Sequence, residues 1–340
     1  MIFQLLIVLA AIVIGARKGG IGLGVAGGLG LAVLTFGFGL RPTSPPIDVM
    51  LMIAAVIAAA SCMQAAGGLD LMVKWAERLL RRHPQHITLL SPLVTYLFTL
   101  LAGTGHVAYS ILPVIAEVAT ETKVRPERPL SIAVIASQQA ITASPISAAT
   151  VVLLSMLAGY DITLIDIMKI AIPCTMAGVL LGALYSMKIG KELADDPEYR
   201  RRLAEGAFES KHRHTREGEN PRGALLSVVL FLVATVGIVI FGSSEALRPV
   251  FHTNEGTVPM QMSHIIEILM LSAAALMLIG TRTNGIRAVQ GSVFSAGMQA
   301  VIAIFGIAWM GDTFISGNMA ALKGGIEQYV TTMPWLFGLA

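Results

Sequence analysis

Two helix-breaking segments interrupt apolar sequence of membrane length between Ser91 and Ser147. The first break, at residues 103–106, lies between two apolar runs, and the second, at residues 142–147, lies inside the apolar span Leu130–Leu157. Because hydrocarbon offers the backbone no hydrogen-bonding partner, unwound chain at that depth is tolerated only where protein buries it or where it lines a water-filled cavity. Two such breaks that carry hydroxyl side chains are typical of a solute site built from broken helices, which predicts a secondary transporter.

The composition agrees with a polytopic membrane protein. Hydrophobic residues make up 55% of the 340 residues and charged residues 13%, and the mean hydropathy is +0.73. Since soluble domains carry about 25% charged residues, an all-α membrane fold is expected. A formal charge of +3 is too small to indicate a nucleic-acid-binding protein. Arg17 and Lys18 follow the apolar segment Met1–Ala16 instead of preceding it, so this segment predicts a first span and not a secretory signal.

Further candidate spans recur along the whole chain. They are Ile21–Leu40, Ile47–Ala66, a hairpin pair within Ile87–Val118, the broken Leu130–Leu157, Leu164–Met187, Gly223–Phe241, Ser263–Ile279 and Ala288–Met310. The segment Asp70–Arg82 is different, because Leu71, Trp75, Leu79 and Leu80 fall on one helical face. The other face is taken by charged side chains, namely Lys74, Glu77, Arg78, Arg81 and Arg82. This pattern predicts a helix that lies in the membrane interface.

The distribution of Lys and Arg predicts the topology. We place the N-terminus outside and treat residues 87–118 as a re-entrant hairpin that enters and leaves the membrane on the same side. Most basic side chains then fall in inside loops, and the outside loops hold Arg41, Arg248 and Lys323. The long polar segment 188–222 becomes a cytoplasmic connector between two halves.

The two halves show signs of an internal repeat. Residues 1–187 and 223–340, joined by the connector 188–222, are expected to be two inverted transmembrane repeats. The sequence Ala-Val-Ile-Ala at residues 55–58 recurs at residues 300–303. Both halves also share the order of a span, an amphipathic segment and a Pro-led apolar run.

The first repeat contains both predicted breaks. Its re-entrant hairpin covers about residues 87–118, and its broken helix covers about residues 130–157. The second copies of these breaks would fall after Ala340, so we expect the second repeat to be incomplete within this sequence.

The first break combines groups that suit an anionic solute. Gly103 and Gly105 permit positive φ and exposed amides, and the half-helix that starts after the break presents a positive dipole end. Thr104 supplies a hydroxyl, and His106 supplies an imidazole that can donate or carry charge. The alternative is a tight turn with a packed histidine. A binding site is favoured because ionisable groups within a membrane usually serve function.

The second break centres on a proline. Pro145 has no amide hydrogen and disfavours helical backbone at Ser144, which frees carbonyl groups one turn earlier. Ser144 and Ser147 then offer hydroxyls to a carboxylate or a cation, and the pair Gln138–Gln139 lies a turn or more upstream. The alternative is an ordinary proline kink whose hydroxyls bond back to their own helix.

Other motifs are weaker. His212 and His214 form an HxH pair, but no third ligand is evident, so no metal site is predicted and a solvated linker is favoured. No cofactor is expected. An enzyme using His106 as base and Ser144 as nucleophile lacks a third, orienting acid, and a channel would need a ring of pore charges.

One glycine pattern also needs an interpretation. The segment 22–27 matches GxGxxG, but no strand precedes it, so a dinucleotide site is disfavoured. Gly20, Gly24 and Gly28 recur at four-residue spacing. We interpret them as a face on which another helix packs.

Five segments resemble one transporter family, namely the anaerobic C4-dicarboxylate transporter (Dcu) family. They are Gly15–Gly20, Gln64–Asp70, Gly103–His106, Arg125–Pro129 and Ala143–Ser147, and the resemblance extends over essentially the whole chain. It implies a bacterial inner-membrane carrier that exchanges or takes up fumarate, succinate, malate or aspartate by alternating access. It also implies an ion-transporter-type fold, with residues 103–106 as the first hairpin tip and residues 144–147 as the first broken-helix loop.

The resemblance also sets the expected partners. These are the C4-dicarboxylate substrate and the lipid bilayer, with a homo-oligomer as an option and no nucleic acid. Since family members continue with a second hairpin and a second Pro-containing break, the alternative is a truncated, non-transporting membrane protein or a partner of a sensor protein.

Overall fold

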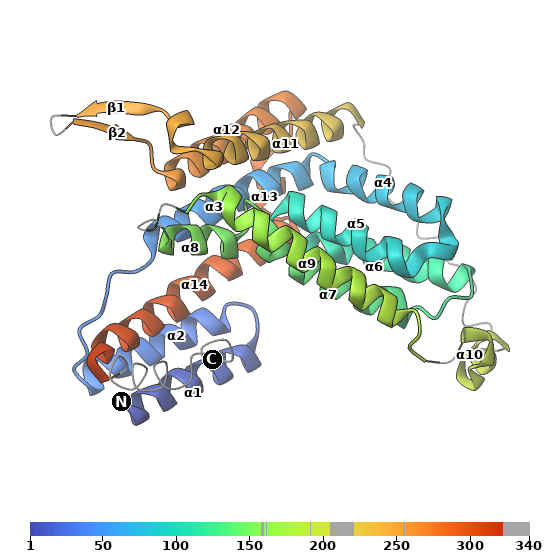
Figure 1. Ribbon diagram of the computed structural model, residues 1–340, viewed down its shortest axis with the longest axis horizontal. Coiled ribbons are helices and arrows are strands. Elements are labelled where there is room, and N and C mark those ends of the chain that lie inside the picture. Colours follow the sequence, from blue (N-terminus) through green and yellow to red (C-terminus); the bar gives the residue numbers. More distant parts are fainter. Residues whose placement is uncertain (158–159, 161, 191, 205–220, 254–255, 322–340) are drawn as a thin grey trace. The chain divides into compact units, whose positions relative to one another are not determined.

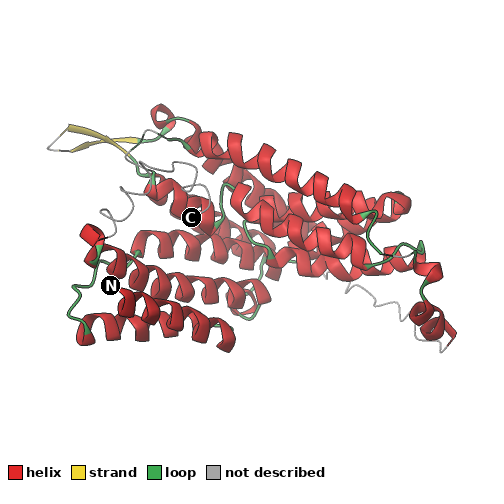
Figure 2. Cartoon of the chain, turned by 60° about the horizontal axis from the view of Figure 1, so that its bottom comes forward, coloured by secondary structure: helices red, strands yellow, loops and turns green. Residues whose placement is uncertain are grey.

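The computed structural model describes residues 1–157, 160, 162–190, 192–204, 221–253 and 256–321 (Figure 1). These residues are mostly helical, as Figure 2 shows. Six helices among them are long and apolar enough to cross a bilayer. The expected all-α polytopic membrane fold is therefore confirmed.

The helices and strands are as follows. The helices are α1 Ile2–Lys18, α2 Gly22–Ala32, α3 Ile47–Ala65, α4 Gly68–Arg82, α5 Ile87–Ala102, α6 His106–Glu121, α7 Glu127–Ala143, α8 Ala148–Met156, α9 Leu164–Ser186, α10 Pro197–Ala204, α11 Pro221–Ser243, α12 Met262–Thr281, α13 Gly285–Val289 and α14 Ser292–Gly317. A π-helical turn covers Val33–Gly37, and short 3-10 turns cover Pro84–His86, Leu193–Asp195 and Glu245–Leu247. The strands are β1 Val250–Thr253 and β2 Gly256–Pro259.

The chain folds into two compact units. One contains residues 1–54 together with those from residue 296 onward, and the other contains residues 55–295. Helices α3 and α14 each contribute residues to both units. These boundaries follow contacts in space, whereas the expected repeats 1–187 and 223–340 follow sequence order, and the repeats stay a prediction.

In the first unit, glycines of α2 pack directly on the backbone of α14. A Cβ at Gly24 would overlap Ile302, and a Cβ at Gly27 would overlap Gly306, so only glycine permits this approach. Gly28 faces open space instead, which corrects part of the predicted four-residue stripe. Successive helical residues lie roughly 100° apart, so a contact centred on Gly27 turns Gly28 away.

In the second unit, α5, α7 and α9 lie side by side (Figure 1). The fully buried alanines of α7, Ala136, Ala140 and Ala143, form a core with Tyr96 of α5 and Val179 of α9. Small side chains let helix backbones approach closely in a membrane protein. This packing fixes α7, which leads into the second predicted break.

Helix α4 buries an apolar face against the protein that the sequence analysis did not single out, apart from Leu80. Its buried apolar side chains are Leu69, Met72, Val73, Ala76 and Leu80. They are buried because α5, α6 and α11 all contact α4. Trp75 and Leu79, from the apolar face that the sequence predicted for the membrane interface, are 42% and 44% exposed. The helix therefore has one apolar face against protein and a second apolar row that faces outward.

The β1–β2 hairpin was not predicted from the sequence. It pairs Phe251 with Val258 and connects α11 to α12. Each strand is only four residues long. A periodicity of two is too brief to recognise over such a length.

Candidate functional site

Both predicted breaks coincide with the ends of helices. Helix α5 ends at Ala102, and Gly103 follows it in the left-handed region with φ of 71°. Helix α6 then starts at His106. Helix α7 ends at Ala143, and Ser144 is extended with φ of −77° and ψ of 130°. The chain therefore leaves helical geometry at the positions that Gly103 and Pro145 favour.

A ladder of hydroxyl contacts aligns α5 with α7. Every rung joins residues separated by 38 positions along the chain, so the two helices run in the same direction. The Ser91 hydroxyl donates to the Pro129 carbonyl at 3.2 Å, the Thr95 hydroxyl donates to the Ala133 carbonyl at 2.9 Å, and the Thr99 and Ser137 hydroxyls lie 2.9 Å apart. The ladder holds the ends of α5 and α7 at the same level.

The two breaks consequently meet. The Ser144 hydroxyl donates to the Leu100 carbonyl at 2.7 Å. A Cβ at Gly103 would come within 2.8 Å of Cγ1 of Ile146, so the first break packs against the second. The Ser137 hydroxyl also donates to the Gly105 carbonyl at 3.3 Å. The two loops, distant in sequence, form one non-helical layer.

The residues just before α5 lie next to the end of α6. Arg81, which lies shortly before α5, pairs with Glu117 and Glu121 at the far end of α6, each at 2.9 Å. Partial burial alone would lower the pKa of Arg81, but its hydrogen bonds to Glu77 and Glu117 and the charge of Glu121 raise that pKa overall. Arg81 therefore stays charged and fastens both ends of the hairpin together.

A second arginine fastens the start of α7 to the end of α9. Arg128 is 8% exposed, and its guanidinium donates to the carbonyls of Ile189 at 2.7 Å and Gly190 at 3.0 Å. It also pairs with Glu192 at 3.0 Å. A planar guanidinium suits such a fork of acceptors. The start of α7 and the first residues of the predicted connector therefore lie together.

The hydroxyls of the second break are occupied within the protein. Ser144 and Ser147 are fully buried, and so is Pro145. The Ser147 hydroxyl donates to the Thr150 hydroxyl at 3.1 Å and accepts from the Thr150 amide at 3.2 Å. With the Ser144 proton directed at Leu100, both serines hold the loop in shape. In this arrangement they do not present hydroxyl protons to a solute.

Exposed donors lie immediately beside these loops. Gln138 and Thr142 lie one turn apart on α7, and both are exposed, as is Gln139. The Nε2 atom of Gln138 is 3.0 Å from the position that a Cβ at Gly105 would take. Thr104 is half-buried, and the side chain of His106 lies outside what the structure describes. The carboxamide beside the hairpin tip, which the sequence prediction did not include in the site, is thus the better placed donor.

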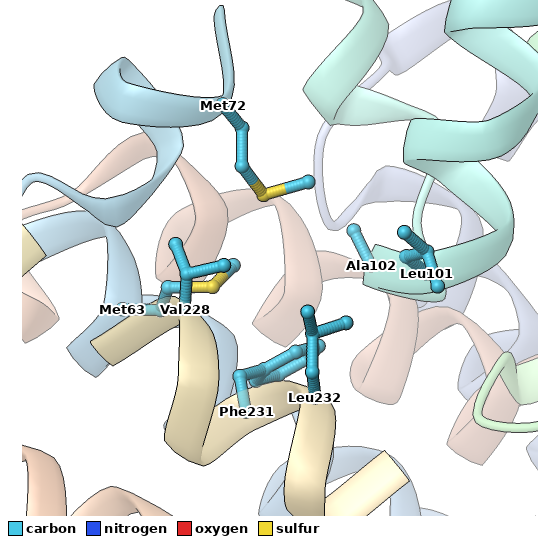
Figure 3. A pocket seen from close by; sticks show the side chains of 7 residues that line it. All are labelled: Met63, Met72, Leu101, Ala102, Val228, Phe231 and Leu232. Carbon is cyan, nitrogen blue, oxygen red and sulfur yellow. The ribbon is translucent and has the colours of Figure 1, made fainter. Parts of the chain in front are cut away.

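A small cavity lies behind the hairpin tip. Figure 3 shows its lining, which comes from α3, α4, α5 and α11: Met63, Met72, Leu101, Ala102, Val228, Phe231 and Leu232. Its volume is about 10 Å³, and every lining side chain is apolar. A water molecule needs at least this volume and also polar partners. The cavity is therefore a packing gap. Its apolar lining closes the hairpin tip on this side.

An ion pair at the start of α9 has a structural explanation, and the HxH pair is not described. Lys169 and Asp166 pair at 3.3 Å, and Asp166 also forms a capping box with Thr163 at the start of α9. These contacts give Asp166 a structural task at a helix end. His212 and His214 lie outside the described residues.

The family described as anaerobic C4-dicarboxylate membrane transporter matches residues 1–340. The chain is 45% identical to the C4-dicarboxylate transporter DcuA of Escherichia coli (strain K12), over 100% of this chain and 77% of the relative. It is 43% identical to DcuA of Wolinella succinogenes, with the same shares covered.

A second group of relatives is slightly more distant. The anaerobic C4-dicarboxylate transporter DcuB of Escherichia coli O157:H7 is 39% identical, over 99% of this chain and 76% of the relative. No solved structure matches the chain. Because both the family match and these identities extend along essentially all of the sequence, the chain belongs to the DcuA/DcuB family of anaerobic C4-dicarboxylate membrane transporters.

Proposed function

We propose that this protein carries C4-dicarboxylates such as fumarate, succinate, malate and aspartate across the bacterial inner membrane. The observation that carries this proposal is the meeting of the two non-helical loops, with Gly103 packed against Ile146. Broken helices that meet inside a membrane protein support a solute site, because transporters typically build their solute sites from such helices.

The dianion is held at the edge of this layer. The N-terminus of α6 faces the hairpin turn, and its amides suit one carboxylate. The exposed carboxamide of Gln138 lies next to Gly105 and supplies a donor for the other. Thr104 and His106 complete the first loop, while Ser144, Pro145 and Ser147 fix the shape of the second. A carboxylate needs donors, which is why Gln138 ranks above the occupied serine hydroxyls.

The helix directions support a re-entrant hairpin. Helices α5 and α7 run in the same direction, and α6 between them runs back. Arg81, at the end of α4 and shortly before α5, reaches the end of α6, and Arg128 at the start of α7 brings the connector to that same side. Several of the most basic loops thus share one face of this unit. The positive-inside rule makes that face cytoplasmic and leaves the N-terminus outside.

The same proposal includes two inverted repeats, residues 1–187 and 223–340, joined by the connector 188–222. In the second repeat, the segment equivalent to α4 would be residues 316–328. It lies partly outside the described residues. Transport then proceeds by alternating access, as exchange of one dicarboxylate for another or as uptake.

Counterflow in liposomes tests the function. Purified full chain is reconstituted with internal succinate, and entry of labelled external fumarate is followed over time. We expect entry that saturates with fumarate concentration, that requires internal dicarboxylate, and that unlabelled succinate but not a monocarboxylate inhibits. Liposomes with empty interiors and liposomes without protein are the controls.

Two outcomes would contradict the proposal. Fumarate entry no faster than in protein-free liposomes would remove the carrier function and leave a non-transporting membrane protein. Entry that rises linearly with concentration and ignores internal succinate would indicate a channel.

A further inference from the structure

Helix α4 lies between two membrane-length helices but cannot cross the membrane itself. It follows α3 after Gly67 and precedes the span Pro84–Ala102. Charged side chains occur at almost every turn of its sequence, GLDLMVKWAERLLRR. Since each charge costs several kilocalories per mole at the centre of a bilayer, α4 lies at the membrane surface.

Protein contacts fix how α4 is rotated about its axis. The side chains of Leu69, Met72, Val73 and Leu80 are buried against the rest of the unit. Arg81 reaches α6 through its ion pairs with Glu117 and Glu121. The remaining arc of the helix therefore faces outward in a defined orientation.

An apolar row occupies part of that outward arc. Leu71, Trp75 and Leu79 recur at four-residue spacing, and Trp75 and Leu79 are 42% and 44% exposed. Trp side chains concentrate at the membrane–water interface because their rings have an apolar body and a polar edge. This row suits the boundary between headgroups and acyl chains.

A basic row runs directly beside the apolar row. Lys74, Arg78 and Arg82 also recur at four-residue spacing, about 60° round the helix from the apolar row. Arg78 and Arg82 are exposed. None of the ion pairs formed among the described residues includes these three cations, although the charge of Lys74 acts on the carboxylate of Asp70, one turn earlier. Arg81 is different, because it forms ion pairs with three carboxylates.

We propose that this outward arc of α4 binds the phosphate headgroups of anionic phospholipids in the adjacent leaflet. Lys74, Arg78 and Arg82 contact the phosphates, while Trp75 and its two leucine neighbours insert at the start of the acyl chains. Charge complementarity favours lipid over a protein partner, because an apolar row edged by a row of cations, two of which (Arg78 and Arg82) are exposed, matches the surface of an anionic bilayer. The assignment is independent of the transported substrate.

Native mass spectrometry of the full chain tests this. Protein in detergent is mixed with phosphatidylglycerol or with phosphatidylcholine, and the bound lipid is counted. We expect retention of phosphatidylglycerol over phosphatidylcholine. The combined change Lys74→Gln, Arg78→Gln and Arg82→Gln should weaken this retention by roughly 100-fold, because each cation near an anionic surface contributes a factor of about five.

Matched controls separate the site from general charge. The combined change Lys188→Gln, Arg200→Gln and Arg201→Gln removes the same charge from exposed positions elsewhere and should leave retention unchanged. If the α4 triple variant aggregates, phosphatidylglycerol retention is measured on the single variant Arg78→Gln instead. The variant Arg78→Lys, which keeps the charge, should retain the lipid as the wild type does. Inorganic phosphate should not compete with the lipid.

Three results would overturn the proposal. They are equal retention of phosphatidylglycerol by the wild type and the α4 variants, equal loss in both triple variants, or displacement of the lipid by inorganic phosphate. A change of oligomeric state in the α4 variants alone would assign this face to a second copy of the chain instead.

Discussion

The hydroxyl of Ser144 donates a 2.7 Å hydrogen bond to the carbonyl of Leu100, and this bond joins the second helix break to the last turn before the first. The carbonyl of Leu100 sits near the end of α5, where the helix supplies fewer amide partners. Ser144 therefore acts on the hairpin tip through α5, as a positioning residue.

Replacing Ser144 by Ala should loosen the contact between the two breaks. We expect a loss of unfolding free energy of about 0.6–2 kcal/mol, the usual value of an interhelical hydrogen bond in a membrane protein. Thermal unfolding in detergent measures the loss, and counterflow should slow with it. Thr142→Ala is the control, because the exposed hydroxyl of Thr142 bonds to the Gln139 carbonyl within α7 and does not join the two breaks. Equal melting temperatures for wild type and Ser144→Ala would show that the bond is dispensable.

Replacing Gly103 by Ala should be more damaging. The position has φ of 71°, which costs about 1–2 kcal/mol for a residue with a Cβ. The new methyl group would also lie 2.8 Å from Cγ1 of Ile146. Because Ile146 is buried, Ile146→Ala lowers stability by itself. The contact is therefore measured as a coupling, and Gly103→Ala should cost less stability in the Ile146→Ala background than in the wild type. Equal costs in the two backgrounds would contradict this contact. Gly28→Ala, which faces open space, serves as the matched control.

Replacing Gln138 by Ala tests the proposed donor. Loss of a hydrogen bond to a charged group is worth about 1.5–3 kcal/mol, so KM for fumarate exchange should rise by about 10- to 100-fold. Gln138→Glu should impair exchange further, because it places a negative charge beside a dianion. Val134→Ala, on an exposed part of the same helix, should change neither KM nor the maximal rate. Unaltered kinetics in both Gln138 variants would remove this residue from the site.

Helix α10, which follows Asp196 in the connector, should detach from Arg125 at acidic pH. Asp196 accepts hydrogen bonds from the amides of Glu198 at 2.9 Å and Tyr199 at 3.4 Å, and it pairs with Arg125 at 3.1 Å. These amides, and then Arg125, lower the pKa of Asp196 in the folded protein. The stabilisation is therefore fully present above the ordinary Asp pKa of about 3.9. It is lost as the pH falls through the lowered value.

A spin label reports this detachment. Placed at position 201 by Arg201→Cys, with Cys62 and Cys174 replaced by Ala, the label should be immobile at neutral pH and mobile in acid. In Asp196→Asn it should be mobile throughout. A label whose mobility ignores pH in the parent protein would contradict the assignment.

Local chemistry made the helix breaks predictable, whereas the roles of their side chains were not. Gly103 and Pro145 restrict the backbone wherever they occur, so their neighbours leave helical geometry in any fold. The partners of Ser144 and Ser147 depend instead on how α5 and α7 are aligned, and no local pattern encodes that alignment. Sequence reasoning therefore located the loops and predicted their serines as ligands, whereas the proposal adds the exposed Gln138 because its carboxamide lies beside Gly105.

Gln138 did carry a signal that could have been used. It precedes Thr142 by one turn, so both fall on the same helical face, away from the alanines that pack against α5 and α9. A polar row opposite a small-residue row marks the side that neighbouring helices leave uncovered. The outward apolar row of α4 was partly visible in the same way, but its buried face, with Leu69 and Val73, depended on contacts from distant segments.

The four-residue rhythm of the α5–α7 ladder restricts how these two helices can slide past each other. A displacement by one whole turn, about 5.4 Å, would bring Thr95 to the carbonyl of Pro129 and Thr99 to that of Ala133. A displacement by half a turn would leave these hydroxyls without an acceptor on the other helix. A disulfide that links α5 to α7 should therefore leave dicarboxylate exchange intact. If exchange were lost on forming this disulfide, the two helices would have to slide past each other during transport, contrary to the expectation. For any displacement smaller than one helical turn, we expect the hairpin and the broken helix to move together as one rigid body.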